Sequence, residues 1–192
     1  MQPAAEPLAA LDENLLDAHD LFSVTEHDSP SLRAAIVLVV AAWEAFVEDT
    51  AQQAFSFIAA NPFPAAPATA SRAAALAHIE QFHNPSHGNI NRLYRQVLGL
   101  PDVSRHWKWS GTTNAEAVAA LGRLLSLRHA IVHRGRAHRK VDGVLPLSAV
   151  GLVRRLAATT HNAVCKHLTR ATGSAPWPVE PRPRSTPHHW GI

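Results

Sequence analysis

The most apolar stretch of the chain, residues 31–61, sets the main limit on its fold. Its apolar residues recur at helical spacing, which predicts an α-helix. Ser29 and Pro30 precede it and Pro62 follows it, and proline suits the first turn of a helix but cannot continue one. We therefore expect a long central core helix. One stripe of this helix carries Ile36, Val40, Trp43, Val47, Ala54 and Ile58.

The composition of the remaining chain favours the same class of structure. With 192 residues, of which 46% are hydrophobic, the chain can bury one good core, so we expect a single domain over residues 1–172. Alternating runs of Val, Ile and Thr, which are typical of strands, are hard to find. These features predict an all-α fold. The further expected helices cover residues 7–28, 69–83, 89–98, about 112–135 and 145–172.

Two regions do not follow this simple helical pattern. Residues 62–113 contain the two short helices and a loop, which we interpret as an insertion in the domain. The loop interleaves aromatic and basic side chains, which can stack on bases and hold phosphates. Alternatively, the tryptophans fill the core while the charges face water. Residues 173–192 are rich in proline and are expected to form a flexible tail. The expected RNA contacts of the loop are Arg105, Trp107, Lys108 and Trp109.

Charge and cysteine content bear on the partners and the compartment. The net charge of +3 and the 13 histidines are compatible with a polyanionic partner such as RNA. The one cysteine, Cys165, cannot form an internal disulfide and fits a reducing compartment. The first eight residues do not resemble a signal peptide, and the apolar run 34–43 is short for a bilayer span. We expect a cytoplasmic protein that does not associate with membranes.

The sequence Ser-Leu-Arg-His-Ala-Ile-Val-His-Arg-Gly at residues 126–135 concentrates the polar chemistry. It falls in the last turns of a predicted helix, where Gly135 suits the end. At about 100° per residue, Arg128 lies in line with leucines one and two turns away, inside the apolar arc. His129 and His133 form a neighbouring stripe. Because a guanidinium cannot shed its charge, Arg128 needs a partner, an opening or a ligand.

Three interpretations of this cluster remain open. His129 and His133 are four residues apart and can ligate one metal ion, although a metal site needs further ligands. A structural interpretation pairs Arg128 with Glu44 of the core helix and places His133 against the helix dipole. A catalytic interpretation is metal-independent RNA cleavage, in which histidine moves protons, arginine holds the phosphoryl oxygens and the RNA supplies the nucleophile. One helix offers one such set, and two copies across a twofold axis would bring both sets around one phosphate.

The segment Arg128-His129-Ala130-Ile131-Val132-His133 resembles the Arg-x4-His motif of the HEPN superfamily. The segment Trp43-Glu44-Ala45-Phe46-Val47-Glu48 looks like the acidic core helix of its RiboL-PSP and MAE-type members. The resemblance covers roughly residues 8–172. It implies an up-and-down helical bundle that dimerises through the motif helices and forms a composite ribonuclease site.

By this resemblance, Arg128 and His133 would be catalytic, His129 would assist them and Glu44 would orient Arg128. We also expect Arg134 and Arg136 to contact RNA, and no metal or cofactor to be required. The expected function is a homodimeric endoribonuclease, a toxin or defence effector that leaves a 2′,3′-cyclic phosphate and has a cognate antitoxin protein. The alternative is an inactive module that binds RNA, a nucleotide or a partner protein, with Arg128 and Glu44 as a structural ion pair.

Overall fold

The computed structural model describes residues 6–23, 30–61, 72–134 and 144–181, and all regular structure in these residues is helical. This confirms the all-α expectation. Where the structure describes them, the expected helices form within a few residues of their predicted bounds, and the helix expected at residues 69–83 ends at Glu80. The elements are α1 (Pro7–Ser23), α2 (Pro30–Ala60), α3 (Arg72–Glu80), α4 (His87–Leu98), the 3₁₀ helix η1 (Ser104–His106), α5 (Asn114–Arg134) and α6 (Val144–Thr172).

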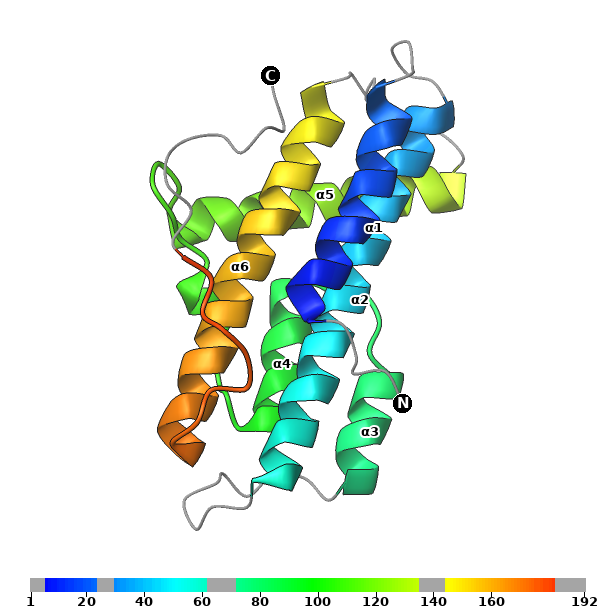
Figure 1. Cartoon of the computed structure of the whole chain (residues 1–192). Coiled ribbons are helices and arrows are strands. Elements are labelled where there is room, and N and C mark those ends of the chain that lie inside the picture. The colour runs from blue at the N-terminus through cyan, green and yellow to red at the C-terminus, as the bar shows by residue number, and fades with distance from the viewer. Residues whose placement is uncertain (1–5, 24–29, 62–71, 135–143, 182–192) are drawn as a thin grey trace.

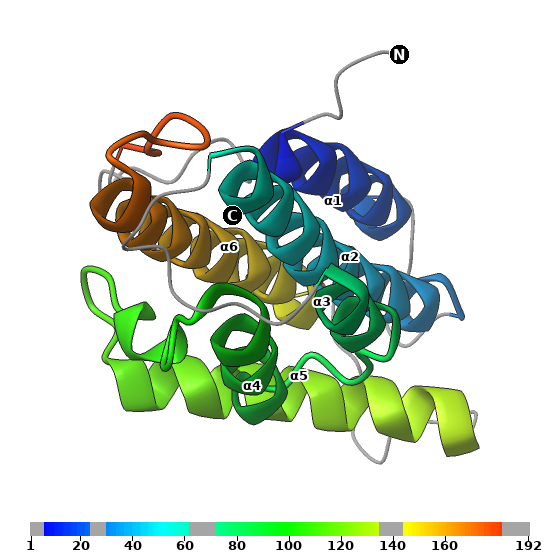
Figure 2. The same cartoon turned by 90° about the horizontal axis from the view of Figure 1, so that it is seen from below.

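Helices α1, α2 and α6 lie side by side and form one layer, in which α1 runs antiparallel to α2 (Figure 1). Helix α5 crosses this layer on its other face instead of running along it (Figure 2). The short helices α3 and α4 pack against α2 towards its C-terminal end. As a result α2 contacts every other α-helix and occupies the centre of the molecule.

The apolar stripe of α2 forms the middle of the core, as expected, because all six of its residues are buried. Trp43 is fully buried, and its indole N–H donates to the carbonyl of Pro85 at 3.0 Å. The hydroxyl of Tyr94 on α4 donates to the carbonyl of Val47 at 3.2 Å. Among the described helices, α2 alone has the length and composition to cross a membrane, and half of that stretch is buried inside the protein.

The chain after α6 differs from the sequence expectation. Residues 173–181, which we call the C-terminal strap, fold back on α6 instead of forming a flexible tail. The indole of Trp177 is 8% exposed and lies 5.1 Å from the ring of His161. Asn162 also pairs with both backbone groups of Glu180, at 2.9 and 3.0 Å. Burying the indole offsets the entropy lost on ordering the strap. Residues 182–192 lie outside the described part of the chain.

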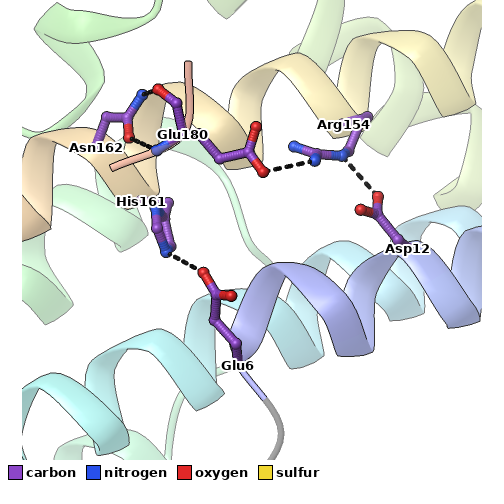
Figure 3. A network of polar contacts seen from close by, with 6 residues as sticks. All are labelled: Glu6, Asp12, Arg154, His161, Asn162 and Glu180. Atoms are coloured by element: carbon purple, nitrogen blue, oxygen red, sulfur yellow. Dashed lines mark hydrogen bonds and ion pairs between the residues drawn. The ribbon is translucent and has the colours of Figure 1, made fainter. Parts of the chain in front are cut away.

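Ion pairs join the start of α1, the middle of α6 and the strap (Figure 3). Arg154 contacts Asp12 at 2.6 Å and Glu180 at 3.3 Å. Glu6 lies 3.0 Å from Nε2 of His161, although the ring N–H is not aligned for a hydrogen bond. Burial lowers the pKa of His161 to about 4, so its ring is neutral at pH 7.

Candidate active site on helix α5

A capping box fixes the start of α5. The hydroxyl of Thr113 accepts from the backbone N–H of Glu116 at 3.3 Å, and the Glu116 carboxylate accepts from the backbone N–H of Thr113 at 2.7 Å. These bonds satisfy backbone donors that the first turn cannot pair. They also lower the pKa of the Glu116 carboxyl. The predicted start near residues 112–114 is therefore confirmed, and the register of all later α5 residues follows from it.

The guanidinium of Arg128 lies where the apolar face of α5 leaves the core. Leu121 and Leu124 are buried, Leu127 is half-buried and Val132 is 50% exposed. Arg128 itself is half-buried, and its Nε has no hydrogen-bond partner although it is shielded from solvent. This orphaned donor confirms that Arg128 lies within the apolar arc. The Nε donor is therefore unsatisfied within the described chain, although the side chain as a whole is only half-buried.

His129 and His133 lie on the solvent-exposed side of α5, next to this arc. Both side chains are exposed, and their ring centroids lie 4.3 Å apart at an interplanar angle of 45°. The one-turn separation in sequence therefore becomes a direct contact between two imidazoles, as their spacing predicts. Imidazole can donate or accept a proton near neutral pH, so this pair can serve acid–base chemistry beside a cation.

Glu44 does not pair with Arg128 in the described chain, which corrects the structural interpretation of the motif. Its Oε1 instead accepts the backbone N–H of Asn84 at 3.0 Å. Asn84 has a positive φ of 59° in the turn between α3 and α4, and the carboxylate anchors that turn to α2. The sequence placed Glu44 correctly at the border of the α2 stripe, because its side chain is half-buried.

The basic and aromatic loop is divided between core and surface. Trp107 is fully buried, and its indole N–H donates to the hydroxyl of Thr160 at 2.8 Å. The expectation that Trp107 binds RNA is therefore wrong, because its ring fills the core between α2 and α6. Trp109 is half-buried, whereas Arg105 and Lys108 are exposed. These three residues remain predicted RNA contacts.

The structure adds cations from α6 that the sequence did not assign to this loop. The guanidinium of Arg155 lies over the Trp109 ring, 5.9 Å from its centroid. Lys166 acts electrostatically on His106 of η1, together with Arg105 and Lys108. The side chain of Arg134, together with Gly135 and Arg136, lies outside the described part of the chain. Within the described residues, no group of three or more His, Cys, Asp or Glu side chains could hold a metal ion.

Fold and site together define a class: an all-α protein that presents an Arg-x4-His sequence on a helix crossing its core layer. The RiboL-PSP-HEPN family model matches residues 8–146, and the chain belongs to this family. The matched residues include all of α2 and α5 and so span residues 128–133. Comparisons with curated proteins and with solved structures gave no match.

Proposed function

We propose that the protein is a metal-independent endoribonuclease that acts as a homodimer. The observation that carries this proposal is the Nε of Arg128, which is buried without a partner beside the accessible imidazoles of His129 and His133. Such an unsatisfied cationic group costs stability, which a function would explain. Membership of the HEPN family favours a role in RNA chemistry over other uses of the same groups.

The groups of the motif suit cleavage by the 2′-hydroxyl of the RNA itself. In this reaction the 2′-oxygen attacks the adjacent phosphorus and the bond from phosphorus to the 5′-oxygen breaks. A histidine accepts the proton of the 2′-hydroxyl, and a second histidine gives a proton to the leaving 5′-oxygen. Arg128 holds the phosphoryl oxygens as negative charge develops. The products are a 2′,3′-cyclic phosphate and a 5′-hydroxyl.

A second copy of the chain would complete this site. His133 follows Arg128 by five residues and therefore points about 140° away from it around the helix. One α5 does not direct both side chains to the same phosphate. Two α5 helices across a twofold axis would place the arginine of one copy near the histidines of the other. The 50% exposure of Val132 leaves an apolar contact for such pairing.

This activity fits a cytoplasmic toxin or defence effector that a cognate antitoxin protein holds inactive. The alternative is an inactive module that binds RNA, a nucleotide or a protein through the same surface. Glu44 bonds the backbone of Asn84 and the Nε of Arg128 has no partner in the described chain, which speaks against the structural ion pair that this alternative included.

The direct test is RNA cleavage by purified protein with EDTA present. We expect cleavage of single-stranded RNA to products with a 2′,3′-cyclic phosphate, and rates at least 100-fold lower for His133→Ala and for Arg128→Ala. Arg123→Ala removes an exposed cation elsewhere on α5 and serves as the control. Melting temperatures of all variants separate loss of activity from loss of folding. Equal cleavage by the parent and His133→Ala would refute the assignment.

A second readout is growth. Induced expression of the parent should arrest growth, and His133→Ala should relieve that arrest at equal protein level. A binding module without turnover would instead leave RNA intact in both the purified assay and the cell.

A further inference from the structure

Five side chains from two distant parts of the sequence form what we call the basic cluster. Arg105, His106 and Lys108 belong to η1 and the loop after it, and Arg155 and Lys166 belong to α6. η1 packs against α6, so these groups share one surface. All except His106 are exposed. Burial and the charges of Arg105, Lys166 and Lys108 lower the pKa of the His106 ring, and the charge of Asp102 opposes this shift.

The α6 members are aligned by helix geometry. Arg155 and Lys166 are eleven residues apart, so they lie within about 20° of each other around the helix. Thr160, which faces the core and bonds Trp107, lies well away from this direction. The cations therefore point outward along one line of α6, beside the loop that carries Lys108.

The Asp102 carboxylate lies close enough to the basic cluster to raise the pKa of His106, against the cations around that ring. Asp102 accepts hydrogen bonds from Asn91, from the hydroxyl of Ser104 and from the backbone N–H of Arg105. The carboxylate of Glu180 contacts Arg154 at 3.3 Å. Arg105, Lys108, Arg155 and Lys166 are all exposed and outnumber the Asp102 carboxylate, so the surface stays basic and can attract an external anion.

Trp109 gives the basic cluster an aromatic component. Its ring is half-buried, and the guanidinium of Arg155 lies 5.9 Å from the ring centroid. An arginine placed over an indole keeps its N–H groups directed outward, where they can bind phosphate oxygens. Cations that follow a backbone beside an aromatic ring are typical of surfaces that bind single-stranded nucleic acid.

The basic cluster and the Arg128 motif lie at opposite ends of α5. η1 packs on the N-terminal end of this helix, and the motif occupies its last two turns (Figure 2). A helix of 21 residues is about 30 Å long. One phosphate group cannot contact both places, but an extended single strand can.

We infer that the basic cluster binds the single-stranded backbone of the RNA substrate at a distance from the bond that is cleaved. This inference rests on the proposed ribonuclease function for the choice of RNA as the polyanion. In a dimer, two such clusters would hold strands that leave the composite site, so the protein would bind long RNA more tightly than short RNA.

The test measures RNA binding by a variant that is expected not to cleave RNA. A fluorescein-labelled oligouridine is titrated, in EDTA, with His133→Ala protein and with the same protein carrying Arg155→Gln and Lys166→Gln. We expect the added pair to weaken binding roughly tenfold and to reduce the slope of log K against log salt by about 1.4, since each phosphate contact to a single strand contributes about 0.7.

A matched control removes two exposed cations elsewhere. His133→Ala protein with Arg72→Gln on α3 and Arg92→Gln on α4 has the same net charge as the test variant, and it should bind as the His133→Ala parent does. An equal loss in both variants would show that only total charge matters and would overturn the inference. Displacement of the RNA by polyglutamate at equal charge would identify a surface for acidic proteins and would also overturn it. Failure of the proposed function is seen separately, as intact RNA after incubation with unmutated protein.

Discussion

Arg128 and Glu44 were expected to form an ion pair, but the structure places them in different surroundings. The Arg128 Nε is buried without a partner, while the Glu44 carboxylate accepts a hydrogen bond from the backbone N–H of Asn84. A buried unsatisfied donor typically costs about 1–3 kcal/mol. The protein tolerates that cost at Arg128, which is the pattern expected of a functional group and agrees with the proposed ribonuclease site.

The new partner of Glu44 changes what its removal should do. Glu44→Ala is expected to destabilise the fold by about 1 kcal/mol, the usual contribution of one hydrogen bond, because only the link to the turn at Asn84 is lost. Glu44→Gln keeps an acceptor oxygen and should cost less. Urea unfolding of both variants measures this. A loss near 4 kcal/mol would instead indicate a buried ion pair.

His161 makes folding sensitive to acid. Burial lowers its pKa from 6.5 to about 4, so between these values the unfolded chain binds a proton that the folded chain does not. Its contribution to stability is present above pH 6.5 and is lost as pH falls towards 4. The groups around the ring are Glu6 from the start of α1, Arg154 and Asn162 from α6, and Trp177 from the strap.

We therefore expect the free energy of unfolding to fall by roughly 1–2 kcal/mol through His161 between pH 7 and pH 5, since one pKa unit corresponds to about 1.4 kcal/mol. Unfolding of the parent and of His161→Gln at both pH values isolates this contribution. The contributions of the other histidines cancel when the two proteins are compared. The same pH dependence in both would show that the ring is protonated equally in the folded and unfolded chain.

Among the elements, the C-terminal strap packs on α6 through Trp177 and Glu180. Trp177→Ala removes an indole that is 8% exposed and in contact with the His161 ring, and should destabilise the protein by about 3 kcal/mol. Val179→Ala in the same strap removes a side chain that is 50% exposed and should change stability by less than about 0.5 kcal/mol. Thermal or urea unfolding compares them. Equal small effects would mean that the strap does not contribute to the core.

For the whole molecule, the proposed dimer can be tested through the exposed apolar residue of α5. Val132→Glu places a carboxylate in the expected contact between two motif helices, and we expect it to yield a monomer by light scattering and to lower RNA cleavage at least tenfold. Val179→Glu introduces the same change at an equally exposed valine on the strap and should leave both unchanged. Full cleavage by a monomeric Val132→Glu protein would contradict a composite site.

The amino-acid sequence by itself determined the helices, their order and the register of α5. Helical periods, proline stops and the Thr113–Glu116 cap depend on residues three or four positions apart, so they can be read without the fold. The same local geometry predicted that His129 and His133 share a stripe beside Arg128.

Only the tertiary structure decided which residues far apart in the chain contact one another. It buried Trp107 against Thr160, gave Glu44 the turn at Asn84 and brought Lys166 beside η1. It also ordered residues 173–181, whose proline content predicted flexibility, because Trp177 is buried against His161. These contacts depend on which helix surfaces meet when the helices pack. The spacing of residues within one helix does not determine which distant surfaces those are.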